Sequence, residues 1–334
     1  MTAADALLAA PPREPARHSN ATRVVIYSLL IVFAIIYLLP LVVMVMTSLK
    51  PLDEVTGGNM FYLPQHLTFE PWTKAWGTAC VGLTCAGLKG YVWNSVKMVV
   101  PAVLISTLLG ALNGYVLTKW RFPGHKLVFG MMLFACFIPF QSVLIPMATI
   151  LGKLGAIGQS LENTIGLSLG FGNPTVNLVL VHVVYGLGFT TLFFRNYYET
   201  FPNELVRAAQ IDGASFFQIF RRILLPNSMP IFIVTVIYQF TNIWNDFLFG
   251  STFAAGDQSP MTVALNNLVN TSTGIVEYNV NMAAAIIAAA MLVLYSTTPV
   301  DVLTMLYNAT VIGAESPAAK VDPNRKSFQM LVNW

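Results

Sequence analysis

The chain has 334 residues, of which 55% are hydrophobic and only 10% are charged, and its formal net charge is +3. A soluble domain carries about 25% charged residues, so this composition excludes an ordinary soluble protein. A helix needs about 20 apolar residues to cross a bilayer core, and the apolar stretches of the chain are therefore candidate membrane spans.

Residues 1–22 contain several Pro and Ala and precede the first apolar stretch, Val24–Met46. The apolar core of a cleavable signal peptide has only about 7–15 residues and is followed by a small-residue cleavage site. Val24–Met46 is longer than such a core and lacks that site. We expect a disordered cytoplasmic tail over 1–22, followed by a retained first helix.

Six apolar stretches are long enough, or nearly so, to span a membrane as helices. They are Val24–Met46, Val96–Val116, Leu127–Leu151, Val176–Phe194, Pro230–Phe249 and Ala283–Val300. Such continuous runs differ from the alternating pattern of transmembrane β-strands. The sequence predicts an all-α, polytopic membrane protein with a six-helix transmembrane domain over 23–306 and a C-terminal tail over 307–334.

Positively charged residues concentrate in alternate loops of this arrangement. They are Arg13, Arg17 and Arg23 before the first span, Lys119, Arg121 and Lys126 after the second, and Arg195, Arg207, Arg221 and Arg222 before the fifth. The other loops are neutral or acidic. Because Lys and Arg favour the cytoplasmic side, both termini and the 195–226 loop are predicted to be cytoplasmic.

Two of the three cysteines, Cys80 and Cys85, lie in the loop predicted to face outward, separated by four residues. A disulfide persists in an oxidising compartment, so we expect these two to be bonded, with two free thiols as the alternative. A metal site is not expected there, because His66 is the one other candidate ligand nearby. Cys136 lies in the third predicted span, where a packing role is expected.

Polar side chains inside the spans are candidates for a transport pathway. They are Gln141 in the third span and Gln239, Asn242, Trp244, Asn245 and Asp246 in the fifth. Amides and aromatic rings together suit a sugar, whose hydroxyls need hydrogen bonds and whose C–H faces stack on rings. The alternative is hydrogen bonding between helices, worth about 1 kcal/mol or less per bond. Both interpretations stand for Asn242, Asn245 and Asp246.

Motifs for chemistry are missing from the sequence. It contains no G-x-x-x-x-G-K-[ST] loop for ATP phosphates, no H-E-x-x-H metal motif and no nucleophile elbow. His182 is the one imidazole within a span, and we expect a hydrogen-bonded packing role for it rather than a proton relay. Buried acids are scarce, which disfavours an ion-coupled carrier.

Residues 202–226 form a polar segment in this otherwise apolar chain. Pro202 and Glu204 suit the first turn of a helix, and Gly213 allows a sharp turn after it. A second short helix is then expected to end before Pro226, with its apolar side chains at helical spacing: Phe216, Phe217, Ile219, Phe220 and Ile223. The sequence predicts a knob that fills a groove on a partner, with an amphipathic helix lying on lipid as the alternative.

Within this segment, Ala208-Ala209 is followed after three residues by Gly213 and after nine more by Ile223-x-Leu225-Pro226. This spacing resembles the cytoplasmic EAA loop of bacterial ABC-importer permeases. Two neighbouring strings resemble the same family, Thr190-Thr191-Leu-Phe-Phe-Arg195-Asn-Tyr197 and Ile243-Trp-Asn-Asp-Phe-Leu248. Over about residues 20–290 the chain looks like a carbohydrate-importer permease of the maltose-transporter type, similar to the smaller maltose permease. The surroundings of Trp244 and the paired cysteines look nearest to glucose- or mannose-type importers.

The resemblance implies a type I importer permease of MetI-like architecture that carries a sugar from the periplasm to the cytoplasm. It implies a loop at 197–228 that couples the chain to an ATPase through Glu204, Arg207, Ala208, Ala209, Asp212, Gly213, Ile223, Leu225 and Pro226. The implied partners are a second homologous permease, two ATPase subunits that bind ATP and Mg²⁺, and a periplasmic solute-binding protein. No cofactor or metal in this chain and no nucleic acid are implied, and the location is the bacterial inner membrane.

The chain departs from the family pattern in two places. Arg207 occupies the position of the family's glutamate, and Glu204, one helical turn earlier, is the candidate replacement. The polar sequence after Val300 replaces the short basic tail expected there. Two alternatives remain: a secondary carrier or channel that needs no nucleotide, and an importer permease for a non-sugar solute such as a phosphodiester or a polyamine.

Overall fold

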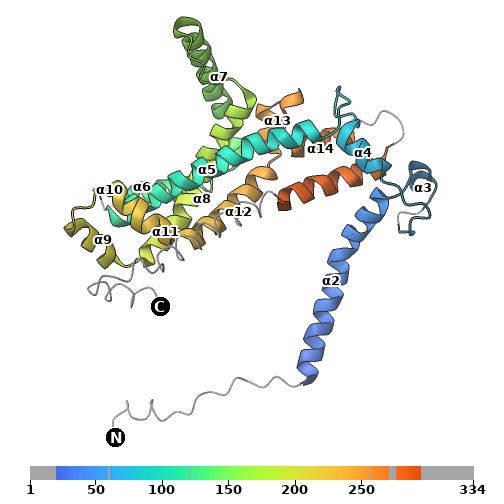
Figure 1. Ribbon diagram of the computed structural model, residues 1–334, viewed down its shortest axis with the longest axis horizontal. Coiled ribbons are helices and arrows are strands. Elements are labelled where there is room, and N and C mark those ends of the chain that lie inside the picture. Colours follow the sequence, from blue (N-terminus) through green and yellow to red (C-terminus); the bar gives the residue numbers. More distant parts are fainter. Residues whose placement is uncertain (1–19, 59–60, 121, 255, 271–275, 295–334) are drawn as a thin grey trace, which may run out of the picture.

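A computed structural model describes residues 20–58, 61–120, 122–254, 256–270 and 276–294. Within these ranges the regular elements are helices, apart from one isolated bridge between Val81 and Thr84. The predicted all-α class is therefore confirmed (Figure 1). Residues 20–22, predicted to belong to the tail, already lie in the first helix. The rest of that tail, the C-terminal tail and the end of the sixth predicted span lie outside the described residues.

The helices follow one another along the chain. Their bounds are α2 Asn20–Ser48, α3 Leu52–Gly57, α4 Glu70–Gly77, α5 Lys89–Lys119, α6 His125–Ala135, α7 Phe140–Ile165, α8 Pro174–Thr200, α9 Asn203–Ile211, α10 Phe216–Ile219, the π-helix η1 Phe220–Leu224, α11 Leu225–Asn227, α12 Met229–Trp244, α13 Leu248–Phe253, the 3-10 helix η2 Gly256–Gln258 and α14 Met261–Asn270. A further apolar helix covers Tyr278–Leu294.

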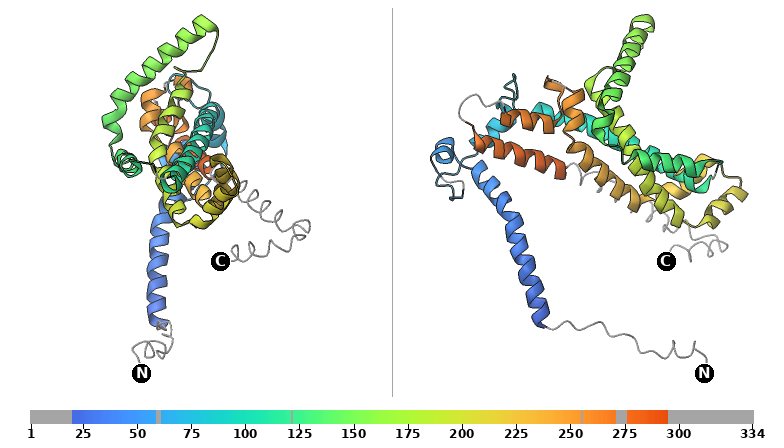
Figure 2. Two further views of the ribbon diagram at one scale, coloured as in Figure 1. Left: turned by 90° about the vertical axis from the view of Figure 1, so that its left-hand side faces the viewer. Right: turned by 180° about the vertical axis from the view of Figure 1, so that it is seen from behind.

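Four helices of the described chain, α2, α5, α7 and α8, are long and apolar enough to cross a membrane. A fifth results if Phe216–Asn227 and Met229–Trp244, which meet at an angle of 79°, form one bent span. Several apolar helices confirm a polytopic membrane protein, and the number of six spans stays a prediction. α2 and α7 project away from the bundle formed by the other long helices (Figures 1 and 2).

The third predicted span, Leu127–Leu151, is wrong as a continuous helix, because the chain divides there into α6 and α7. Pro139 has an extended conformation (φ −59°, ψ 133°) and lacks the N–H that a helix interior needs. Proline also disfavours helical geometry at the residue before it. The chain therefore leaves α6 in a turn, in which the Phe137 N–H donates to the carbonyl of Phe134 over 3.0 Å.

Helix ends also differ from the apolar stretches that predicted them. α8 continues to Thr200, beyond the predicted end at Phe194, because a helix does not stop where its residues become polar. It ends at Phe201, whose extended backbone (ψ 132°) fits its position before Pro202. α12 ends at Trp244, before the predicted Phe249, and the last helix begins at Tyr278, before the predicted Ala283.

The close contact of α5 with α8 forms the centre of the bundle. Small residues on α5 allow it, since a Cβ atom on Gly110 would lie 2.3 Å from Thr190 Oγ1. A Cβ on Gly114 would lie 2.8 Å from the backbone N of Arg195. Between the two helices the Thr190 hydroxyl donates to the Ser106 carbonyl over 3.0 Å. Small residues and such bonds are the means by which helices associate inside a membrane.

We predict that Gly114→Val destabilises the protein, because the added side chain meets backbone atoms of α8 that cannot move away. Overpacking of this kind costs about 1–3 kcal/mol. The thermal unfolding midpoint of the purified chain in detergent measures it. Gly90→Val is the matched control, since Gly90 lies on the same helix with no atom within 4 Å of an added Cβ. Equal midpoints for the two variants would contradict the prediction.

Candidate functional site

The EAA-like segment, residues 197–228, contains a helical hairpin whose first arm is α9. This helix ends in a Schellman motif, in which the N–H of Ala214 donates to the Ala209 carbonyl over 2.9 Å. The N–H of Gly213 donates to the Gln210 carbonyl over 3.1 Å. The motif requires a left-handed residue, and Gly213 has a φ of +78°. The turn predicted at Gly213 is present.

The second arm begins with a capping box formed by Ser215 and Gln218 and continues through α10, η1 and α11. The prediction that it ends before Pro226 is wrong, because Pro226 lies inside α11 and the chain bends only at Ser228. The wider π-helical turn comes just before Pro226, so the missing N–H falls in the first turn of α11, where it is tolerated.

Most apolar side chains of the second arm face the chain's own bundle rather than outward. Tyr115, near the end of α5, stacks on Phe216 with ring centroids 4.7 Å apart and on Phe220 at 5.7 Å. Ile219 and Leu224 are fully buried. The prediction that Phe216, Ile219 and Phe220 fill a groove on a partner is therefore wrong. Helical periodicity places them on one face, and the aromatic end of α5 covers that face.

The outward surface of the hairpin is polar with two exposed apolar residues at its tip. Ile211 is 86% exposed and Phe217 is 68% exposed, one on each side of the Gly213 turn. The exposed coupling candidates are Glu204, Arg207, Ala208, Asp212 and Gly213; Ala209 is buried, and Ile223, Leu225 and Pro226 are half-buried. Sequence reasoning missed Ile211, although an isoleucine beside Asp-Gly at a helix end is a recognisable signal.

Hydrogen bonds hold the segment to the ends of α5 and α8. Lys119 Nζ donates to the Phe201 carbonyl and to Asn203 Oδ1, each over 2.7 Å. Tyr197 donates its hydroxyl to the Asn227 carbonyl over 2.6 Å. Together with the aromatic packing beneath it, these bonds fix the hairpin to the ends of α5 and α8.

Two candidate pathway residues, Gln239 and Trp244, lie inside the chain's own core. The Gln239 amide donates to Ser106 Oγ over 3.0 Å and so joins α12 to α5. Trp244 is 2% exposed, and its ring stacks on Phe240 with centroids 5.7 Å apart. These contacts favour helix packing over lining of a path for both residues.

Asp246 connects α12 with the elements that follow it. Its carboxylate accepts from the N–H groups of Phe249 (3.4 Å) and Gly250 (3.1 Å) at the start of α13. It also lies 3.7 Å from His182 Nε2 on α8. The hydrogen-bonded packing role expected for His182 is only partly observed, because within the described chain its buried Nε2 has no hydrogen-bond partner.

The remaining pathway candidates are exposed. Asn242, in the last turn of α12, and Asn245, the residue directly after this helix, are both exposed. The Asn242 amide donates back to the Tyr238 carbonyl over 2.8 Å. Gln141 is exposed in the first turn of α7. The structure thus divides the six candidates into a packing group (Gln239, Trp244, Asp246) and an exposed group (Gln141, Asn242, Asn245).

At the other end of the bundle, the Cys80 and Cys85 sulfurs form a disulfide that closes a tight loop before α5. An ion pair between Lys74 and Glu277 joins α4 to the start of the last helix. The described ranges contain no group of three or more His, Cys, Asp or Glu side chains placed to hold a metal ion.

Comparisons with known proteins agree with this geometry. Residues 103–312 match the family described as "Binding-protein-dependent transport system inner membrane component". The "Xylose/arabinose import permease protein XacI" of Haloferax volcanii is 34% identical over 283 residues, which cover 83% of this chain and 89% of that protein. The "Diacetylchitobiose uptake system permease protein NgcG" of Streptomyces coelicolor is 31% identical over 222 residues, 66% of each chain.

A solved structure, the crystal structure of a bacterial ABC transporter involved in the import of the acidic polysaccharide alginate, has the same fold. Its matching chain superposes with a TM-score of 0.67 at 19% identity, covering 87% of this chain and 98% of that one. The family match and the 34% identical relative together decide the assignment. The chain belongs to the family of inner-membrane components of binding-protein-dependent transport systems, and it is a non-enzymatic permease subunit that works with an ATPase and a substrate-binding protein.

Proposed function

We propose that this permease carries a sugar inward and is coupled to its ATPase through residues 197–228. The observation that carries the proposal is the hairpin tip, where Ile211 and Phe217 are exposed beside a polar surface while the rest of the hairpin is anchored. Exposed apolar side chains at the tip of a fixed element fit a groove on a partner. Glu204 is exposed on the same helix as Arg207 and supplies the acid that the family pattern places at 207.

Coupling then works by rigid-body transmission. The second arm of the hairpin runs through η1 and α11 into α12 after a single 79° bend. Movement of the docked ATPase subunits therefore turns α12, which carries the exposed Asn242 in its last turn and is followed directly by the exposed Asn245. Rotation of rigid units about an interface is an established kind of switching transition. ATP and Mg²⁺ belong to the ATPase in this scheme, and the chain itself holds no cofactor.

A sugar is the substrate class that the exposed face of α12 supports best. Two amides project from it, and Tyr238 on the same helix contacts Phe189 and Phe193 with ring centroids 5.9 and 5.1 Å apart. Amides and aromatic rings together suit sugar hydroxyls and C–H faces. The names of the relatives point the same way, since they include permeases for xylose/arabinose, diacetylchitobiose and alpha-glucosides.

The same exposed face requires a partner in the membrane, since polar amides are costly in lipid. We infer a second, homologous permease that encloses the path with this one, and an assembly with two ATPase subunits and a periplasmic binding protein. The positively charged loops favour a cytoplasmic side for both termini and the hairpin, and therefore an outer side for the Cys80–Cys85 loop. The six predicted spans and the tails at 1–22 and 307–334 belong to this proposal.

We predict that Gly213→Val uncouples the transporter. A β-branched residue at φ +78° is strained by about 1–3 kcal/mol, which displaces the hairpin tip and lowers ATP-driven sugar uptake by roughly tenfold or more. Uptake into proteoliposomes and ATP hydrolysis are measured together. Gly166→Val is the control, because Gly166 also ends a helix at positive φ (+68°) with open space around it, outside the hairpin. Wild-type uptake by Gly213→Val would refute the coupling role.

The two groups of polar residues predict opposite phenotypes. Asn242→Ala and Asn245→Ala each remove an exposed amide, so we expect an unchanged unfolding midpoint. Sugar uptake should fall about three- to tenfold, because each variant loses one hydrogen bond to the substrate. Gln239→Ala removes the bond to Ser106 and leaves a cavity, so we expect a loss of about 1–3 kcal/mol of unfolding free energy. Destabilisation by all three variants alike would contradict the division.

A further inference from the structure

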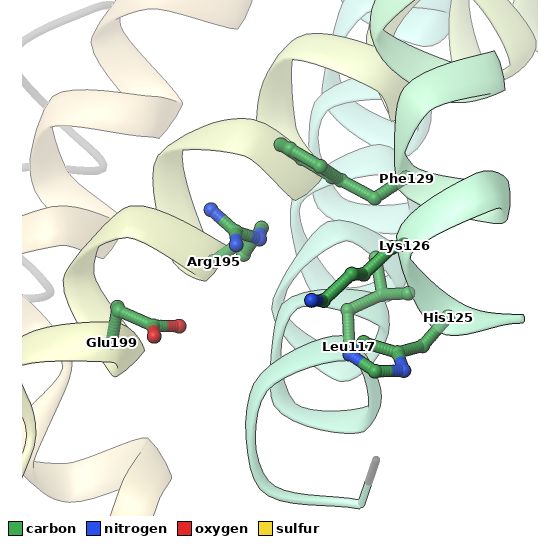
Figure 3. Close-up of a pocket in the computed structure, with 6 residues that line it drawn as sticks. All are labelled: Leu117, His125, Lys126, Phe129, Arg195 and Glu199. Atoms are coloured by element: carbon green, nitrogen blue, oxygen red, sulfur yellow. The ribbon is translucent and has the colours of Figure 1, made fainter. Parts of the chain in front are cut away.

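A pocket of about 470 Å³ opens between the end of α5, the start of α6 and the last turns of α8. It is lined by Leu117, His125, Lys126, Phe129, Arg195 and Glu199 (Figure 3). Its volume lies within the range of about 300–1,000 Å³ that is usual for small-molecule sites. The end of α5 and the start of α6, which line it, lie at the same end of the bundle as α9 and α10 (Figure 1). Of its six lining residues, Glu199 alone belongs to the coupling segment 197–228, and the proposed sugar path uses none of them.

Two cations from different helices point into this pocket. Figure 3 shows the Lys126 ammonium of α6 and the Arg195 guanidinium of α8 directed towards the same space. In the described part of the chain, Lys74–Glu277 is the ion pair found between a lysine or arginine and a carboxylate, so neither pocket cation has a carboxylate partner there. Like charges facing one space repel, and an anion between them removes that repulsion.

Within the described residues, the guanidinium of Arg195 is held in place by a ring contact and makes one weak hydrogen bond. Its Cζ lies 4.1 Å from the centre of the Phe129 ring, a cation–π contact. The hydrogen bond it makes within the described chain goes to Asn196 Oδ1 at 3.4 Å, near the limit of such a bond. A planar fork with free N–H groups matches the oxygens of a phosphate in a bidentate manner.

The other lining residues decide what kind of phosphate fits. Leu117 and Phe129 offer apolar surface, and His125 is fixed at the start of α6 by a 2.8 Å contact of its Nδ1 with the Phe122 carbonyl. Glu199 also lines the pocket, so the lining contains two cations and one carboxylate. This small net positive charge disfavours a strongly charged free anion. A phosphodiester with an apolar tail carries one negative charge and fits this lining.

We propose that this pocket binds the phosphate of an anionic phospholipid headgroup at the cytoplasmic surface of the membrane. The orientation comes from the proposed function, whereas the binding chemistry stands on the pocket alone. The cytoplasmic leaflet carries anionic lipids, and basic pockets between membrane helices on that side hold their headgroups. A bound phosphate joins Lys126 to Arg195 and so ties α6 to α8 beside the coupling hairpin.

The test uses the purified full chain in mild detergent with equal amounts of phosphatidylglycerol and phosphatidylcholine. Native mass spectrometry then counts the lipid that each variant retains. We expect preferential retention of phosphatidylglycerol by the wild type. Because a cation near an anionic membrane surface is worth about 1 kcal/mol, Lys126→Gln and Arg195→Gln should each weaken retention roughly fivefold. Arg195→Lys keeps the charge but loses the planar fork, and we expect an intermediate loss.

Lys89→Gln is the matched control, since Lys89 is an exposed cation at the opposite end of α5. Its retention of phosphatidylglycerol should equal that of the wild type. Equal retention by Lys126→Gln and Arg195→Gln overturns the proposal, provided that both variants keep the wild-type unfolding midpoint. Displacement of the lipid by millimolar inorganic phosphate also overturns it, because the pocket then takes phosphate from solution. The lipid count does not depend on ATP-driven uptake, so a failure of the coupling proposal leaves it unchanged.

Discussion

The close approach of α5 and α8 is the contact on which the rest of the structure depends. It exists because Gly110 and Gly114 leave no side chain between the helices, and the Thr190 hydroxyl bonds across the gap to α5. The C-terminal ends of these two helices lie side by side. They supply the aromatic packing and the hydrogen bonds that hold the hairpin of residues 197–228. Inside a membrane, where apolar burial does not drive association, such packing determines the position of everything attached to it.

A second constraint is the continuous helical path from the hairpin into α12. The π-helical turn and the bend at Ser228 redirect the chain by 79° without a flexible loop. Ser228 is fully buried there and donates to the hydroxyl of Tyr198 on α8 over 3.2 Å. The bend is therefore a rigid corner, and it connects the surface that we propose for ATPase docking with the helix face that we propose for the substrate.

The sequence predicted the features that depend on local chemistry. Long apolar runs located α2, α5 and α8, since a helix in lipid must be apolar along its length. The left-handed turn at Gly213 was predictable because its spacing and residue type are those of a helix end. The family resemblance rested on the same spacing and is confirmed by the comparisons.

One error was local, and the others arose where distant parts of the chain meet. Pro139 lies within an apolar stretch, so hydrophobic composition alone predicted one continuous span where the structure has α6 and α7. The inward packing of Phe216 was not visible, because its partner Tyr115 lies a hundred residues earlier and only the fold brings them together. For the same reason, the sequence did not separate Gln239, which bonds to α5, from Asn242, which faces outward on the same helix.

We propose above that the hairpin tip is the docking surface for the ATPase. Co-purification from native membranes in mild detergent tests it most directly, comparing the wild type with a double variant, Ile211→Ser and Phe217→Ser. We expect the wild type to retain an ATPase and a second permease. The double variant should insert normally and keep the permease but lose the ATPase. Equal recovery of the ATPase with both proteins would contradict it.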